Sequence, residues 1–316
     1  MKKGDFTLRM DDGVEVFARR FEPDSKPRGV LVVAHGVAEH SGRYERLAER
    51  LSKEAWILLV PDHRGHGRTA ASSGGRGWFA ASKGFFRVVE DLHAFRLFAE
   101  REWPGLPVAL LGHSMGSSLA RAYIALHGEG LAACALSGIV ALPPALAAAS
   151  GLVAGLGRLL QGGRGIAEFA DSITLGGYAK AFEPVRTRND WLSRDPEQVD
   201  AYNADPDCGF TCTWDFFRDM SEGSAFIARR STLERIPRGL PVLIFAGSRD
   251  PVGAAIGGVE ALAAAYRASG LVDVTSKLYP EGRHEMLNET NRAEVMDDLA
   301  AWLERAAAGG GSGAKA

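Results

Sequence analysis

Short apolar runs and helix-like periodicity alternate along most of this chain. A continuous apolar run of four to eight residues predicts a strand that is covered on both faces. Segments in which apolar residues recur every three or four positions predict amphipathic helices between those strands. The predicted strands are residues 29–35, 56–60, 108–111, 132–139, 240–246 and 272–279, and the predicted helices are residues 41–54, 85–102, 118–126, 260–267 and 294–307.

This alternation predicts an α/β protein with a mostly parallel sheet and helices on both faces. Residues 5–21 alternate instead and turn at Asp12-Gly13, which predicts an antiparallel hairpin at the sheet edge. Between the fourth and fifth apolar strands the pattern breaks into helical and loop segments. We therefore expect a discontinuous core of residues 1–139 and 238–308, a cap of residues 140–237 and a flexible tail of residues 309–316.

Ser114 lies where a predicted strand runs directly into a predicted helix. Gly112 and Gly116 flank it two residues away on either side, because so sharp a turn leaves no room for a Cβ atom there. The serine must take a strained backbone conformation, which lifts its hydroxyl clear of the sheet. The backbone N–H of Met115, at the first residue of the helix, has no helical acceptor. The pattern predicts a nucleophilic serine with one oxyanion donor beside it.

A serine hydroxyl needs a general base to react at neutral pH. His284 lies in a loop directly after a late strand, at the sheet edge from which Ser114 also emerges. A carboxylate must fix the tautomer of this histidine, and Asp250 follows the preceding strand, with Glu281 as the alternative. The chain order Ser114, Asp250, His284 is typical of hydrolases with a nucleophile elbow. We predict that these three residues are catalytic.

A second oxyanion donor is expected in the loop after residues 29–35. Gly36 permits the backbone to turn there, and the Val37 N–H then becomes available. Residues 62–67, Asp-His-Arg-Gly-His-Gly, resemble a metal site in composition. Ligands that alternate with glycine on one tight turn cannot all converge on an ion, so we favour a hydrogen-bonded turn that supports the oxyanion loop. We predict no metal and no cofactor.

Composition narrows the class of partner. The 316 residues carry a formal net charge of −2, which provides no basic surface for nucleic acid, so no nucleic-acid partner is expected. The three cysteines have neither disulfide-framework nor zinc-site spacing. The first five residues are not followed by an apolar segment, so we predict no secretory signal. These features predict a cytoplasmic protein.

Residues 131–157 contain no charged side chain. A transmembrane helix is one interpretation, but prolines and several glycines interrupt the stretch, so we favour a buried strand followed by part of the cap. We expect the segment after residue 139 to cover the active site, to line the acyl pocket through Leu152, and to touch a lipid surface transiently with its outer face. The other predicted substrate contacts are Gly36, His113, Trp191 and Trp214.

Several stretches resemble the monoacylglycerol lipase and lysophospholipase-like group of α/β-hydrolases, a serine aminopeptidase-type family. The resemblance implies an α/β-hydrolase fold with an inserted, mainly helical cap. It gives the nucleophile role to Ser114, the rest of the triad to Asp250 and His284, and the oxyanion hole to the amides of Val37 and Met115. The stretches are residues 34–44 (AHGVAEHSGRY), 61–67 (PDHRGHG), 106–116 (LPVALLGHSMG), 202–206 (YNADP) and 250–251 (DP).

The resemblance implies hydrolysis of a small-molecule ester or lipid with an apolar acyl chain, through an acyl-enzyme. An amino-terminal peptidase and a carbon–carbon bond hydrolase use the same scaffold and remain alternatives, as does a ligand receptor that retains the triad. Leu287 and Gly253 stand where animal monoacylglycerol lipases carry a histidine and a cysteine near the glycerol end. The resemblance therefore does not imply that this protein shares the headgroup preference of those lipases.

Overall fold

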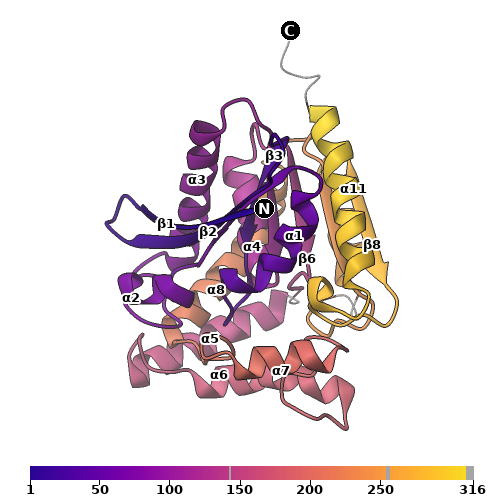
Figure 1. Ribbon diagram of the computed structural model, residues 1–316. Helices are drawn as coiled ribbons and strands as arrows, with labels where there is room; N and C mark the ends of the chain where they lie inside the picture. The colour runs from indigo at the N-terminus through magenta and orange to yellow at the C-terminus, as the bar shows by residue number, and fades with distance from the viewer. Residues whose placement is uncertain (142–143, 254–256, 311–316) are drawn as a thin grey trace.

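The computed structural model describes residues 1–141, 144–253 and 257–310, and an eight-stranded sheet runs through it (Figure 1). The strand order is β1-β2-β4-β3-β5-β6-β7-β8. β2 pairs antiparallel with β1 and β4, and the other neighbours pair in parallel. The strands are β1 (Lys2–Arg9), β2 (Glu15–Glu22), β3 (Gly29–Ala34), β4 (Trp56–Pro61), β5 (Val108–His113), β6 (Ala133–Ser137), β7 (Val242–Gly247) and β8 (Val274–Tyr279).

The apolar runs correspond to the strands that they predict. Every residue of β3, β4, β5, β6 and β7 is buried, as expected of strands covered on both faces. In β1, by contrast, exposed and half-buried residues alternate, and this strand lies at the edge of the sheet. The hairpin between β1 and β2 turns at Asp12-Gly13, where Gly13 adopts a φ of 85°. The predicted edge hairpin is confirmed.

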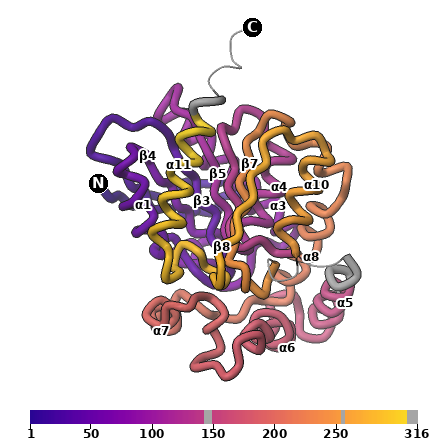
Figure 2. Tube along the Cα trace, turned by 90° about the vertical axis from the view of Figure 1, so that its right-hand side faces the viewer, coloured from indigo at the N-terminus to yellow at the C-terminus, as the bar shows by residue number. Residues whose placement is uncertain are grey.

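Helices cover both faces of the sheet (Figures 1 and 2). Along β3, Val30 and Val32 pack into one apolar cluster and Leu31 and Val33 into another, since successive side chains of a strand point to opposite faces. Short helices η1 (Ser41–Tyr44), η2 (Gly67–Thr69), α2 (Ala70–Ser73) and η5 (Met286–Asn288) lie in the connecting loops. The first cluster is covered by α3 (Gly84–Glu102), α4 (Met115–His127) and α10 (Gly258–Ala268), and the second by α1 (Glu45–Ser52) and α11 (Arg292–Gly310).

The segment between β6 and β7 is helical and lies beyond the end of the sheet at which β5 meets α4 (Figure 1). Its last long helix, α8, packs against α3 and α4 and so joins this segment to the core. Its helices are α5 (Pro144–Gln161), α6 (Glu168–Ile173), η3 (Leu175–Phe182), α7 (Pro196–Ala204), α8 (Trp214–Ile227) and α9 (Arg230–Leu233).

The sequence pattern predicts that glycines interrupt residues 131–157, but Gly151, Gly155 and Gly157 do not break the helix. They lie inside the continuous helix α5, which packs against α8. A Cβ atom at Gly157 would lie 2.4 Å from the Trp214 ring, and one at Gly151 would lie 2.8 Å from Ser221 Oγ. These glycines therefore allow two helices to approach closely. Within the described ranges, no helix is long and apolar enough to cross a membrane.

The end of the chain is described only in part. Gly309 and Gly310, the first residues of the predicted tail, continue α11. The rest of that tail, residues 311–316, lies outside the described residues.

Candidate active site

Ser114 occupies the corner between β5 and α4. Its φ of 53° and ψ of −118° are strained for a residue with a side chain. A Cβ atom at Gly116 would lie 1.9 Å from the Ala34 carbonyl oxygen, and one at Gly112 would lie 2.3 Å from the Gly116 carbonyl oxygen. Only glycine fits at either position, so β3, β5 and α4 can approach closely enough to hold the serine at the predicted corner.

His284 and Asp250 lie beside Ser114 at the ends of neighbouring strands. The loop after β8 places His284 Nε2 2.8 Å from Ser114 Oγ. The loop after β7 places Asp250 Oδ1 3.0 Å from His284 Nδ1. The carboxylate can thus accept the Nδ1 proton, which leaves Nε2 to accept the serine proton. The structure brings together the three residues that the sequence selected, all of them buried.

The position of Asp250 distinguishes it from the alternative carboxylate. Its Oδ1 also accepts the Val252 N–H at 2.9 Å, which fixes the side chain against its own loop. The side chain of Glu281 is 66% exposed and pairs with Arg249 instead. The geometry therefore supports Asp250 as the partner of the histidine.

Two opposing effects set the proton affinity of His284. Burial lowers the pKa of His284, because it disfavours the charged imidazolium. The charge of Asp250 and its hydrogen bond act in the opposite direction and outweigh burial, so the pKa of His284 is raised above its ordinary value of 6.5. A base whose pKa lies near neutrality can take a proton from serine and return it to a leaving group.

Two backbone amides flank the serine. Met115 is the first residue of α4, where an N–H group has no acceptor in the helix. Val37 lies in the loop after β3 and, with Met115 and Ser114, lines one cavity. Neither amide donates a hydrogen bond to any acceptor in the described part of the chain. This is the arrangement that stabilisation of a carbonyl oxyanion requires.

A buried ion cluster fixes the oxyanion loop. Glu39 accepts the Gly36 N–H through Oε1 and pairs with Arg43 through Oε2 at 2.8 Å. Arg43 also binds both carboxylate oxygens of Glu285, at 2.6 and 2.7 Å. Burial alone would raise the pKa of Glu39, but the Arg43 charge outweighs it and holds this pKa below its usual value. Because Glu285 directly follows His284, the cluster ties the oxyanion loop to the histidine loop.

The histidine-rich turn at residues 62–67 is held by hydrogen bonds to the same loop. His35 Nε2 accepts the His63 N–H at 2.9 Å, so its Nδ1 carries the proton that it donates to the Gly36 carbonyl at 2.7 Å. Burial lowers the pKa of His35 to about 4, which keeps the ring neutral at pH 7. Both oxygens of Asp62 accept backbone N–H groups. The structure supports the interpretation of a supporting turn.

Among the described residues, His40, Asp205 and Cys208 are the one group whose ligand atoms could share a metal ion. His40 Nδ1 accepts the Gly42 N–H at 3.1 Å, so the neutral ring carries its proton on Nε2. That nitrogen faces Asp205 Oδ2 at 2.9 Å, and a metal would need the lone pair that the proton occupies. We interpret the group as a hydrogen bond between the oxyanion loop and the segment after α7.

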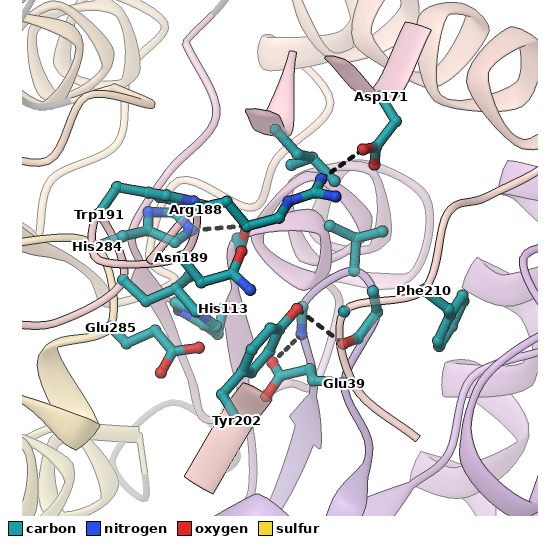
Figure 3. Close-up of a pocket in the computed structure, with 17 residues that line it drawn as sticks. Glu39, His113, Asp171, Arg188, Asn189, Trp191, Tyr202, Phe210, His284 and Glu285 are labelled. Atoms are coloured by element: carbon teal, nitrogen blue, oxygen red, sulfur yellow. Dashed lines mark hydrogen bonds and ion pairs between the residues drawn. The ribbon is translucent and has the colours of Figure 1, made fainter. Parts of the chain in front are cut away.

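Two cavities meet at Ser114. The larger, of about 320 Å³, has a mostly apolar lining from α4, α8 and η3, including Phe217 and Met220. The smaller, of about 30 Å³, has a mixed lining, and Figure 3 shows the polar side chains of Glu39, Arg188 and Asn189 around it. We call them the apolar cavity and the polar cavity. A substrate with one apolar and one polar end would fit across the serine.

The predicted substrate contacts divide into two groups. Gly36, His113 and Trp191 line the polar cavity, and their contact with substrate stays a prediction. Leu152 needs correction, because its side chain is 77% exposed on the outer side of α5 and lines neither cavity. Trp214 also needs correction. It is buried against Gly157, donates Nε1–H to a glutamine of α5 at 3.0 Å, and is absent from both linings.

Sequence reasoning missed several polar residues at the site. Arg188 pairs with the buried Asp171 at 2.6 Å, and both line the polar cavity (Figure 3). They come from a segment without regular periodicity, where no motif marks them. Tyr202, whose hydroxyl donates to a carbonyl of the oxyanion loop at 3.0 Å, lies within the YNADP stretch. Glu285 could have been found, since it directly follows the predicted base.

A serine at a strand-to-helix corner, with an aspartate and a histidine from the next strand ends, defines a serine hydrolase of the α/β-hydrolase fold. The chain matches the serine aminopeptidase S33 family over residues 25–291 and belongs to that family. It is 33% identical to a monoacylglycerol lipase of Mycolicibacterium smegmatis over 301 residues, covering 92% of this chain and 93% of that one. A monoglyceride lipase of Rattus norvegicus is 30% identical over 306 residues, with 92% and 88% covered.

Solved structures agree with this assignment. The crystal structure of a highly thermostable carboxyl esterase from Bacillus coagulans, in complex with glycerol, superposes with a TM-score of 0.89 at 30% identity, covering 97% of this chain and 99% of that one. The predicted α/β-hydrolase fold is confirmed. The chain is a carboxylic-ester hydrolase, as its sequence predicts.

The raised pKa of His284 can be tested directly. In an NMR pH titration, we expect the imidazole of His284 to titrate above 6.5. Asp250→Asn should lower that pKa, because the largest charge that opposes burial is then removed. Glu281→Gln is the matched control and should leave it unchanged. By linkage, the His284–Asp250 pair stabilises the fold below the unfolded pKa, and this contribution is lost as the pH rises through the folded one.

Proposed function

We propose that this enzyme hydrolyses monoacylglycerols and related esters that carry a single apolar acyl chain. The observation that carries the proposal is the division of space at Ser114 between an apolar cavity of about 320 Å³ and a polar cavity of about 30 Å³. The first fits an acyl chain and the second a small alcohol. The names of the bacterial and rat relatives, and the glycerol complex of the Bacillus coagulans esterase, support the same substrate class.

In the proposed reaction, His284 Nε2 takes the proton of Ser114 as Oγ bonds to the ester carbonyl carbon. The carbonyl oxygen becomes an oxyanion between the Val37 and Met115 amides, while Asp250 stabilises the imidazolium. The carbon–oxygen bond to the alcohol then breaks, and the alcohol leaves with the proton from His284. Water attacks the acyl-enzyme in the same way, which releases the acid and returns the proton to the serine.

The charges around the polar cavity favour an uncharged alcohol. Glu39 and Glu285 share one cation, Arg43, and Asp171 pairs with Arg188. Carboxylates thus outnumber guanidiniums in this group, so a phosphate-bearing headgroup would be repelled. We infer that a monoacylglycerol is preferred over a lysophospholipid of the same chain length.

Two further parts of the proposal concern the whole chain. We infer that residues 140–237 act as a cap on a core of residues 1–139 and 238–308, since the apolar cavity is lined by α8 and η3 from the first and by α4 from the second. A cytoplasmic location is supported by the cysteines, which are free thiols in the described chain. Cell fractionation would test the location.

Ser114→Ala tests the proposed nucleophile. Loss of the hydroxyl should lower kcat on a monoacylglycerol by about 10⁶, as removal of a triad serine does elsewhere, with an unchanged circular dichroism spectrum. The parent should cleave a monoacylglycerol faster than a lysophosphatidate of equal chain length. Activity of the variant above a few per cent would contradict the role of Ser114. A preference for the lysophosphatidate would contradict only the headgroup inference.

A second prediction concerns the apolar cavity. With p-nitrophenyl esters, kcat/KM should rise about threefold to fourfold per added methylene until the cavity is full, because each buried methylene contributes roughly 0.8 kcal/mol. Met220→Glu places a charge in the lining and should damage long-chain esters far more than acetate. Val272→Glu is the control, since its exposed side chain lines no part of the cavity. An equal change in the ratio of long-chain to acetate turnover in both variants would contradict the proposal.

We also propose that the enzyme contacts a lipid surface through α5. Leu152, Leu156, Leu159 and Leu160 are each more than half exposed and recur at the spacing of one helical stripe. Ile173, which is 57% exposed, also lines the apolar cavity, so the exposed apolar surface reaches the cavity mouth. Such a surface suits docking on a bilayer from which a single-chain lipid can enter.

Vesicle cosedimentation tests the lipid contact. Leu159→Glu combined with Leu160→Glu should weaken binding to phosphatidylcholine vesicles by about tenfold or more, because each leucine transferred from water contributes roughly 1.5–3 kcal/mol. Val272→Glu alters an equally exposed apolar residue on the core and should leave vesicle binding unchanged. Equal binding of the double variant and the parent would show that the stripe does not dock.

A further inference from the structure

A third cavity, of about 340 Å³, lies against α4. It is a groove bounded by α4, by α10, and by α9 together with the end of α8. Its lining is largely apolar and includes Ile227, Leu233 and Leu262. We call it the α10 groove. It belongs neither to the polar cavity nor to the catalytic residues.

Arg121 is the one charged residue among the described residues that line the α10 groove. It forms no ion pair with any carboxylate in the described chain, and the undescribed residues 142–143, 254–256 and 311–316 include no Asp or Glu. Its Nη1 donates to the Val140 carbonyl at 3.2 Å, while its Nε is buried without a hydrogen-bond partner. A buried donor without an acceptor costs free energy, so an anion that reached this guanidinium would be bound favourably.

A second buried polar group lies beside the guanidinium. The Tyr266 side chain is fully buried, and its hydroxyl also has no hydrogen-bond partner. Burial raises the pKa of Tyr266 to about 12 even though the nearby Arg121 charge acts to lower it. The hydroxyl is therefore neutral and keeps a proton to donate. Tyr266 does not line the α10 groove and its hydroxyl lies against the Arg121 side chain, so Arg121 is the charged donor that a ligand in the groove would meet.

The α10 groove is continuous with the apolar cavity. Val140, Ala141 and Ser224 line both. Arg121 lies on α4 seven residues after Ser114, which corresponds to roughly 10 Å along the helix axis. An amphiphile released at the serine would find the groove within one chain length.

We propose that the α10 groove is a second binding site, for a long-chain fatty acid. The carboxylate lies on Arg121, whose planar guanidinium can donate two parallel hydrogen bonds to its oxygens. The hydrocarbon tail lies along the apolar side chains of α8, α9 and α10. The inference rests on the proposed function only for the source of the ligand, because hydrolysis at Ser114 would release such an acid beside the groove.

Equilibrium dialysis with radiolabelled dodecanoate, below its micelle concentration, tests the site in a Ser114→Ala background. We expect two equivalents to bind, one in the apolar cavity and one in the α10 groove. Adding Arg121→Gln should weaken one of them by about tenfold or more, since hydrogen bonds to a charged group contribute roughly 1.5–3 kcal/mol. Arg101→Gln, which changes an exposed arginine of α3, is the control and should retain both.

Ala261→Trp is an independent variant that fills the groove from the exposed side of α10 and leaves Arg121 in place. It should remove the same equivalent. Dodecanol, which has the chain without the carboxylate, should bind only once to the Ser114→Ala protein. Binding of a single dodecanoate there, or unchanged binding after Arg121→Gln and Ala261→Trp, would overturn the inference. Failure of the proposed ester hydrolysis would appear instead as absent turnover by the parent, which this assay does not measure.

Discussion

The close approach of three backbone segments at Ser114 is the constraint on which the site depends. β3, β5 and the first turn of α4 meet where a Cβ atom at Gly116 would lie 1.9 Å from the Ala34 carbonyl oxygen. Because no side chain separates them, the serine can hold a φ of 53° and present its hydroxyl to both cavities. The same approach brings the loop after β3 alongside the first residue of α4, which places the Val37 and Met115 amides on one lining.

Buried ion pairs also fix the geometry of the site. Arg43 joins Glu39 on the oxyanion loop to Glu285 on the histidine loop, across 242 positions of sequence. All three side chains are largely withdrawn from water, so removing one would leave an uncompensated buried charge, which is strongly destabilising. The loop that carries Val37 and the loop that carries His284 are therefore positioned by one cluster, although they come from opposite ends of the chain.

The sequence was sufficient for the sheet and the triad because both depend on local patterns. Continuous apolar runs mark the buried strands, and Gly112 and Gly116 mark the sharp turn. The exposed side of α5 is harder to predict. Residues 131–157 contain no charge, so the sequence shows no polar face that would indicate which side of the helix faces water. The sequence pattern therefore predicts a buried Leu152, whose side chain is exposed. It also predicts a substrate contact for Trp214, which packs on α5 instead. Pairs such as Arg188 with Asp171 arise from tertiary contact alone.

The backbone contacts beside the triad restrict how the segment between β6 and β7 can move. His284 donates its N–H to the Trp191 carbonyl at 3.4 Å, and Glu285 donates to the Leu192 carbonyl at 2.7 Å. These two hydrogen bonds join residues 191 and 192 to the loop that carries His284. Lifting these two residues would therefore pull His284 away from Ser114. If the whole segment moved as one rigid body, the contact between Ser114 and His284 would be broken each time a substrate entered. Movement confined to α5 and α6 would leave residues 191 and 192, and with them His284, in place.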